Sequence, residues 1–275
     1  MAVMRRARPS SVLLLAAAVL AAGLAACATA RNYPDPSGPR FHGEFAGQPS
    51  PPTIKVVTLN LKFSRRVATA VQLLRQAEAL KGADLIALQE MDDAGAGAIA
   101  RALSLNYVYY PGAVHPKTGR DFGNAILAPW PIQADAKLPL PHPGRFRKMR
   151  RIAVGATVLV RQAAVRFYSV HLETPGAVSA AGRREQAAAV VQDAAGFDRV
   201  VVAGDFNNEA IVARIFQEAG YRWITRDVGD TISRWAWDHV FTRGLRLRDF
   251  ASVGALAERR GVSDHKPVWA EVVLE

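Results

Sequence analysis

The segment from Val200 to Glu209, with the sequence VVVAGDFNNE, places the strongest constraint on the fold of this chain. Its apolar residues run without interruption into Gly204, which is typical of a strand that is buried on both faces. Asp205 and Asn207 follow, and because alternate residues of an extended chain point the same way, their side chains share one face. The carboxyl end of a buried strand is where open α/β sheets bind ligands. An ordinary Asx turn after a strand is the alternative interpretation.

The first 26 residues predict an export signal that is not part of the fold. Three arginines precede an apolar run over residues 12–22, which is too short to span a membrane and is typical of a secretory signal. The sequence LAAC that ends at Cys27 resembles the bacterial lipoprotein processing site, in which the cysteine is lipidated. Cys27 is also the single cysteine, so the chain has no disulfide framework. An ordinary cleaved signal peptide is the alternative.

These features predict a domain organisation and a location. Residues 1–26 are interpreted as a lipoprotein signal peptide, residues 27–52, rich in proline and glycine, as a flexible linker, and residues 53–275 as one domain. We expect an exported monomer that is anchored to a membrane through a lipid on Cys27, on the periplasmic side or at the cell surface. Without the signal, 32 Lys and Arg face 24 Asp and Glu, a charge of +8 that favours phosphate-bearing or anionic-lipid partners.

Strand-like and helix-like segments alternate along the domain, with hairpins among them, which predicts α/β layers around mixed sheets. Strands are expected at 54–61, 84–88, 106–110, 123–127, 152–160, 164–170, 199–203, 237–242, 245–252 and 266–274, and helices at 92–103, 179–195 and 209–219 and from Ser64 to Gly82. The strands around Gly244 are expected to pair. Residues 133–149 alternate prolines with basic residues and are expected to form a surface excursion. Its end carries a basic cluster, for which a solvated loop and a phosphate-binding role are both considered.

Polar residues mark the boundaries of six apolar strands. They are Asn60, Glu90, His171, Asp205 with Asn207, Asp238, and Asp264 with His265. Each has a common structural explanation, because Asn and Asp often form turns and a lone histidine is usually a hydrogen-bonded surface or core residue. Their joint occurrence at strand boundaries, where scaffolds present functional groups, favours one shared site.

The same positions lie in motifs that resemble the endonuclease/exonuclease/phosphatase superfamily. The matching segments are TLNL (58–61), LIALQE (85–90), GNAIL (123–127), SVHLE (169–173), AGDFN (203–207), WDHVF (237–241) and SDHKPV (263–268). They occur in the family's order and together are specific, although each alone is weak. The resemblance implies a four-layered α/β sandwich in which two mixed β-sheets pack face to face and are flanked by helices.

The resemblance also implies roles for the site residues. Asn60, Glu90 and Asp264 would hold Mg²⁺, with Mn²⁺ as the alternative, and Asp205 and Asn207 would orient the nucleophile and the phosphate. The catalytic residues would further include His265, Asp238 and His171. The substrate-binding candidates are Asn124, from the motif GNAIL, and Arg147 and Arg151, from the basic cluster. We favour His265, paired with Asp238, as the base that activates water, with Asp205 as the alternative. His171 would donate to a phosphoryl oxygen or protonate the leaving group.

The sequence therefore predicts a magnesium-dependent phosphoesterase that hydrolyses phosphodiester bonds. The charge of +8 and the basic segment from Arg147 to Arg151 favour a nucleic acid substrate, whereas the lipid anchor, Trp235 and Trp237 favour a phospholipid headgroup. Repair nucleases of the superfamily carry a tyrosine where this chain has His171, so a role in DNA repair is not expected. The alternative is a non-catalytic lipoprotein that binds or scaffolds and retains the fold.

Overall fold

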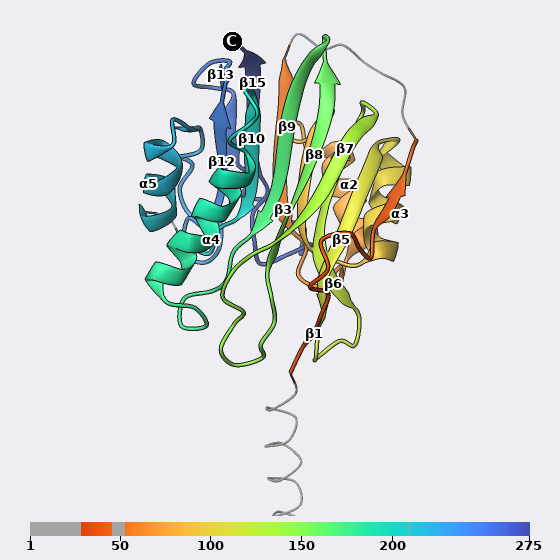
Figure 1. Ribbon diagram of the computed structural model, residues 1–275. Helices are drawn as coiled ribbons and strands as arrows, with labels where there is room; N and C mark the ends of the chain where they lie inside the picture. Colours follow the sequence, from red (N-terminus) through yellow and green to blue (C-terminus); the bar gives the residue numbers. More distant parts are fainter. Residues whose placement is uncertain (1–28, 46–52, 209) are drawn as a thin grey trace, which may run out of the picture.

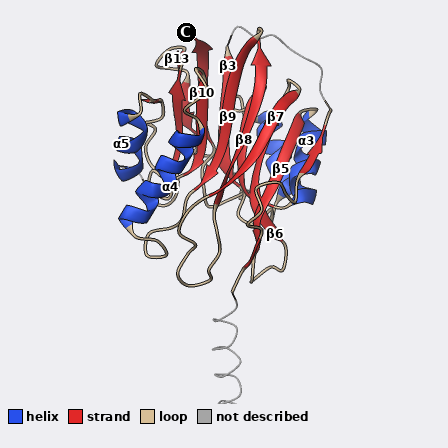
Figure 2. Ribbon diagram, in the orientation of Figure 1, coloured by secondary structure: helices blue, strands red, loops and turns tan. Residues whose placement is uncertain are grey.

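The apolar strands pair into two mixed sheets that pack face to face between two layers of helices (Figures 1 and 2). The computed structural model describes residues 29–45, 53–208 and 210–275. Within these residues, α2 (Val67–Gln76) and α3 (Asp93–Leu103) cover one outer face, and α4 (Ala180–Asp193) and α5 (Ala210–Glu218) cover the other. The four-layered sandwich predicted from the sequence is confirmed.

The larger sheet has nine strands and the smaller sheet has six among the described residues. The larger contains β1 (Arg31–Asn32), β2 (Phe41–Gly43), β3 (Ile54–Asn60), β4 (Leu85–Met91), β5 (Asn106–Val114), β6 (Asp121–Ala128), β13 (Leu245–Leu247), β14 (Val253–Ala255) and β15 (Val268–Leu274). The smaller contains β7 (Ile132–Pro139), β8 (Ile152–Val160), β9 (Ala163–His171), β10 (Val200–Asp205), β11 (Arg222–Trp223) and β12 (Asp238–Arg243).

The central strands are apolar on both faces because each face packs against a different layer. In β10, Val201 and Ala203 enter the core between the two sheets, and Val200 and Val202 pack against the outer helices. The same alternation holds in β3 and β4 against the other helix pair. Because both faces of these strands are buried, their sequences are continuously apolar.

Strand direction brings the polar strand ends to one edge of the sandwich. β3 runs parallel to β4, and β9 runs parallel to β10, so the residues that end these strands lie side by side. β12 runs antiparallel to β10 and begins with Asp238 directly opposite Asp205. β15 runs antiparallel to β3, so the loop that precedes β15 also reaches this edge.

The segment 133–149, which we expected to be a surface excursion, instead contributes the edge strand β7, which pairs with β8. Most of β7 is partly exposed, and it ends at Pro139. An edge strand tolerates proline and lacks a continuous apolar pattern, which is why the sequence did not indicate it. Part of the predicted flexible linker is also ordered in the sheet, since β1 and β2 pair with β5.

Two local predictions are corrected by the side chains. Ser64 does not cap α2, which begins at Val67; its hydroxyl accepts a hydrogen bond from the backbone N–H of Asp92 at 3.0 Å. The strands on either side of Gly244 lie in different sheets and do not pair. Gly244 has a φ of +68°, and a Cβ there would lie 2.4 Å from a backbone oxygen, so this crossing requires glycine.

The predicted signal peptide and Cys27 lie outside the described residues. No helix among the described residues is long and apolar enough to cross a membrane.

Candidate active site

The Asp205 carboxylate is the centre of the polar cluster at this edge. Its Oδ1 accepts a hydrogen bond from the backbone N–H of Asn207 at 2.9 Å, and its Oδ2 accepts one from Asn60 Nδ2 at 3.0 Å. The Nε2 atoms of His171 and His265 lie 3.4 Å and 3.7 Å from the same Oδ2. Burial raises the pKa of Asp205 to about 7, against the lowering influence of His265. The cluster therefore holds a carboxyl group that titrates near neutrality.

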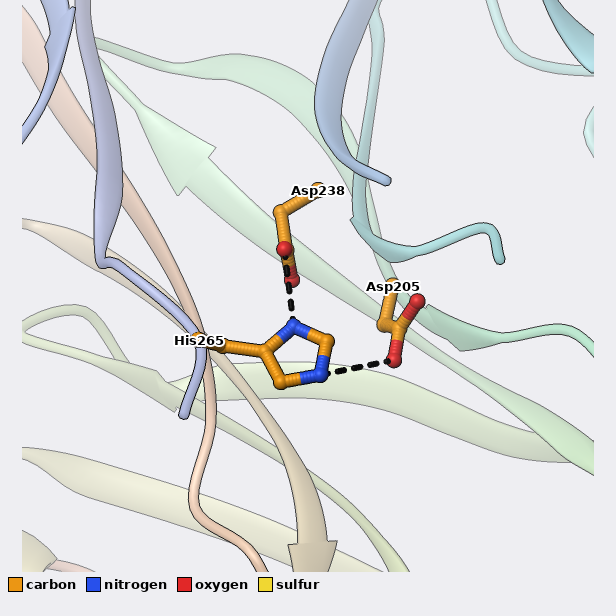
Figure 3. A group of neighbouring side chains, drawn as sticks. All are labelled: Asp205, Asp238 and His265. Carbon is orange, nitrogen blue, oxygen red and sulfur yellow. Dashed lines mark hydrogen bonds and ion pairs between the residues drawn. The ribbon is translucent and has the colours of Figure 1, made fainter. Parts of the chain in front are cut away.

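His265 lies between two carboxylates (Figure 3). Its Nδ1 is 2.8 Å from Asp238 Oδ2, and Thr231 Oγ1 donates to that same oxygen at 2.6 Å. Burial lowers the pKa of His265, but the charges of Asp238 and Asp205 outweigh it and raise the pKa to about 10. The two carboxylates thus favour the protonated form of His265, which donates hydrogen bonds through both ring nitrogens.

His171 is held by a buried arginine. Arg151 contacts His171 Nδ1 at 3.1 Å and Glu173 Oε1 at 3.4 Å. Because a guanidinium only donates hydrogen bonds, Nδ1 of His171 is the acceptor and Nε2 carries the proton, which it directs toward Asp205. Burial, Arg151 and His265 all lower the pKa of His171, so it is a neutral N–H donor.

Glu90 is directed into the site by an irregularity in β4. The pairing of β4 with β6 shifts register between Leu88 and Met91, and Glu90 there has a φ of +57°. A bulge of this kind re-aims one side chain. Burial raises the pKa of Glu90, whereas Arg151 and a hydrogen bond from Asn60 lower it. The carboxylate thus lies next to Asn60, as the prediction of a shared metal site requires.

These oxygens fit a small divalent cation. Mg²⁺ prefers hard oxygen ligands, retains several waters and needs only one or two carboxylates from the protein. The Glu90 carboxylate offers such a donor beside Asn60. The Asn60 amide nitrogen donates to Asp205, and its Oδ1 accepts a hydrogen bond from the Lys62 backbone N–H at 3.0 Å, so the second lone pair of Oδ1 is what Asn60 would offer a cation. Asp205, Asp238 and His265 also present ligand-type atoms within 4.8 Å of one another. That group suits Mg²⁺ less well, because it contains an imidazole that is protonated at neutral pH.

Asp264 is engaged by a lysine instead. Lys62 Nζ lies 2.8 Å from Asp264 Oδ2, and both side chains are about half exposed. Burial raises the pKa of Asp264, but Lys62 and His265 lower it below its ordinary value. A cation at this carboxylate would have to displace the ammonium group, so Glu90 and Asn60 are the better-placed ligands of the predicted set.

The predicted substrate-binding residues divide into three cases. Asn124 is 1% exposed, and its Nδ2 donates to the backbone oxygens of Ile152 and Ser169 at 3.0 Å each. These hydrogen bonds join the two sheets. The buried side chain therefore does not fit the predicted substrate-binding role. Arg151 acts through His171, as described above. Arg147 and Arg151 both line a pocket of about 260 Å³. Of the two, Arg147 is the one whose side chain is available to a ligand in that pocket.

An apolar cavity opens on the other side of Asn207. It has a volume of about 560 Å³ and is lined by Trp235, Trp237 and Ile211 among others. The two indole rings are stacked with centroids 6.1 Å apart, and Trp235 is 47% exposed. These tryptophans therefore form an accessible wall beside the catalytic cluster.

The sequence analysis did not predict the residues that form hydrogen bonds or ion pairs with the predicted site residues. Lys62, Thr231 and Glu173 hold Asp264, Asp238 and Arg151 respectively. Lys62 and Glu173 lie inside or beside the quoted motifs, which is the one local signal for them. Thr231 has no such signal, because it comes from a loop before β12.

A buried carboxylate, a paired imidazole and an adjacent acidic oxygen donor at the edge of a two-sheet sandwich define a phosphoesterase of the metal-dependent kind. The chain belongs to the endonuclease/exonuclease/phosphatase family, whose model matches residues 57–265. No curated protein matches the sequence.

Solved structures share the fold at low sequence identity. The chain is similar to an endonuclease/exonuclease/phosphatase from Bacteroides vulgatus, with a TM-score of 0.66, 16% identity and coverage of 81% of this chain and 99% of that one. It is also similar to D. rerio TDP2 complexed with a single-strand DNA product, with a TM-score of 0.63, 17% identity and coverage of 80% and 98%. Sphingomyelinase C from Streptomyces griseocarneus gives a TM-score of 0.58, 18% identity and coverage of 80% and 99%.

Proposed function

We propose that this phosphoesterase hydrolyses phosphodiester bonds with the help of Mg²⁺ held by Glu90 and Asn60. The observation that carries the proposal is the buried Asp205 carboxylate, which lies within 3.7 Å of two imidazole nitrogens and one amide nitrogen. A cation bound beside it would neutralise negative charge that develops on the phosphoryl oxygens. Mn²⁺, which also accepts carboxylate oxygen ligands, is the alternative metal.

In the proposed mechanism, Asp205 is the base and His265 is a cationic donor. Burial raises the pKa of Asp205 to about 7, so its carboxylate accepts a proton from water as the water oxygen bonds to phosphorus. The bond from phosphorus to the leaving oxygen breaks in the same step, and the leaving oxygen takes its proton from the imidazolium of His265. His265, held by Asp238, and the Nε2–H of His171 donate hydrogen bonds to the phosphoryl oxygens, whose charge increases in the transition state. This exchanges the two roles that the sequence analysis favoured, since the protonated His265 has no site free for a proton.

The pH dependence of kcat/KM distinguishes these two assignments. With Asp205 as the base, we expect the rate to rise with pH through the pKa of the carboxyl, about 7, and to fall as His265 loses its proton near its pKa of about 10. A bound cation would lower both values and leave the order of the two limbs unchanged. If kcat/KM for bis-p-nitrophenyl phosphate instead rises with pH through the pKa of His265 and does not fall above it, neutral His265 is the base.

The substrate has two candidates, each favoured by one observation. A nucleic acid is favoured by Arg147 and the other cations around the site, in line with the fold shared with a DNA-bound TDP2. A phospholipid headgroup is favoured by the exposed Trp235 beside Asn207, in line with the fold shared with a sphingomyelinase. We further propose an exported monomer anchored through Cys27, which a Cys27→Ser variant would release into the soluble fraction.

A substrate screen tests the proposed function. Bis-p-nitrophenyl phosphate, plasmid DNA and sphingomyelin are each incubated with the full-length chain, once with Mg²⁺ and once with EDTA. We expect turnover of at least one phosphodiester that EDTA abolishes and that Mg²⁺ or Mn²⁺ restores. No EDTA-sensitive turnover of any of them would favour the non-catalytic binding or scaffold alternative.

A further inference from the structure

A third cavity, distinct from the pocket at Arg147 and the apolar cavity at Trp235, lies on the Asp264 side of the site. It has a volume of about 560 Å³, and its charged lining residues are Lys62, Arg65, Arg66, Arg259, Arg260 and Asp264. The lining comes from two loops, one after β3 and one before β15, which meet because these two strands are antiparallel neighbours. We call it the arginine pocket.

The arginine pocket carries a large excess of positive charge. Five cations face one carboxylate, and that carboxylate, Asp264, is already paired with Lys62 at 2.8 Å. The side chain of Arg66 has no hydrogen-bond or ion-pair partner among the described residues. Like charges gathered around a concave surface repel one another and focus the field on a bound anion. The pocket therefore has the electrostatics of an anion site.

The remaining arginines are partly held in place. Arg65 lies over the Phe63 ring at 5.4 Å, and Arg259 donates to the backbone oxygen of Asp264. Arg260 donates to Gln76 Oε1 at 2.5 Å, and its Nε pairs with Glu258 Oε1 at 3.3 Å. Each guanidinium has five N–H donors, and these contacts use at most two of them, which leaves the others for a ligand. Guanidinium groups bind phosphate through two parallel hydrogen bonds, which makes phosphate the anion that best matches this lining.

The position of the pocket relates it to the reaction. Asp264 lines it, and the next residue is the imidazolium that faces Asp205. We propose that the arginine pocket binds a second phosphate group of the substrate, so that the enzyme prefers phosphodiesters that carry an additional phosphate near the scissile one. This inference rests on the proposed function, because it assigns the substrate of the same site.

The test combines binding without catalysis and a pair of variants. Tripolyphosphate is titrated into the full-length chain in EDTA by calorimetry, for wild type, for the double variant Arg66→Gln/Arg260→Gln and for the control Arg161→Gln/Arg184→Gln. The control arginines are exposed and lie outside the pocket, in the β8–β9 turn and on α4. Because the pocket variant lacks two of the five cations, we expect it to bind tripolyphosphate about tenfold more weakly, with the control unchanged. Equal affinity in all three proteins would overturn the proposal.

Matched substrates then test the preference and its source. Thymidine 5′-(p-nitrophenyl phosphate) is compared with its 3′-phosphorylated form, and phosphatidylglycerol with phosphatidylglycerol phosphate. We expect a higher kcat/KM for the doubly phosphorylated member of at least one pair, and the pair that responds identifies a nucleotide or a lipid headgroup as the source. The preference should disappear in Arg66→Gln/Arg260→Gln. If no diester is hydrolysed, the proposed function fails, and the titration in EDTA still decides whether the pocket binds phosphate.

Discussion

Replacing Asp205 with Asn is expected to lower kcat for bis-p-nitrophenyl phosphate by roughly 10³-fold or more, within the range that general-base catalysis contributes. The amide has nearly the shape of the carboxylate but cannot accept a proton from water. It also removes the negative charge that holds the Nε2 atoms of His171 and His265 within 3.4 Å and 3.7 Å. Steady-state kinetics at saturating Mg²⁺ measure the effect, and thermal unfolding checks that the variant is folded.

Asp193→Asn is the matched control for this change. Asp193 accepts a hydrogen bond from the Tyr168 hydroxyl at 2.5 Å and takes no part in the catalytic cluster. The Asp193→Asn enzyme should keep kcat within about twofold of wild type, because the substitution leaves the residues around Asp205 unchanged. An Asp205→Asn enzyme that retains more than a tenth of the wild-type rate would remove Asp205 from the role of base.

Replacing Glu90 with Gln is expected to raise the Mg²⁺ concentration for half-maximal activity by roughly a hundredfold. Glu90 is the carboxylate that the bulge in β4 directs beside Asn60, and Mg²⁺ depends on few protein carboxylates. Outer partners of metal ligands alone change affinity by roughly 10–100-fold, so loss of a ligand should reach the upper end. Activity against Mg²⁺ concentration and calorimetric titration with Mn²⁺ give two independent readouts.

Glu185→Gln serves as the control for the Glu90 variant, because Glu185 is exposed on α4, where it pairs with His142 at 2.6 Å. It should leave both metal curves unchanged. If Glu90→Gln shifts neither the Mg²⁺ dependence nor Mn²⁺ binding, then the cation is held elsewhere or is not required.

Local sequence predicted α/β layers and polar residues at strand ends, and the resemblance of the motifs to the endonuclease/exonuclease/phosphatase superfamily implied the four-layered sandwich and the roles of the site residues. Strands such as Val200–Asp205 are apolar on both faces, which only a layered α/β core explains, and each ends in a polar residue at the same sheet edge. Parallel pairing of β9 with β10 then places His171 opposite Asp205 without further information. The predicted cluster around Asp205 therefore follows from strand order.

The partners of these residues could not be predicted, because they arise from contacts between distant segments. Lys62 reaches Asp264 from 202 positions away, and no local pattern indicates that pairing. The protonation of His265 depends on two carboxylates, Asp205 and Asp238, converging on one buried ring. The proposal of Asp205 as the base therefore rests on burial and distances, which sequence does not give, whereas sequence alone favoured the histidine.

The most direct test is to locate Mn²⁺ by anomalous diffraction in a crystal of the enzyme soaked with the metal. We predict a single peak beside the carboxylate of Glu90 and the side chain of Asn60, outside the group formed by Asp205, Asp238 and His265. A peak enclosed by Asp205, Asp238 and His265, or no peak near Glu90, would contradict this account of the site.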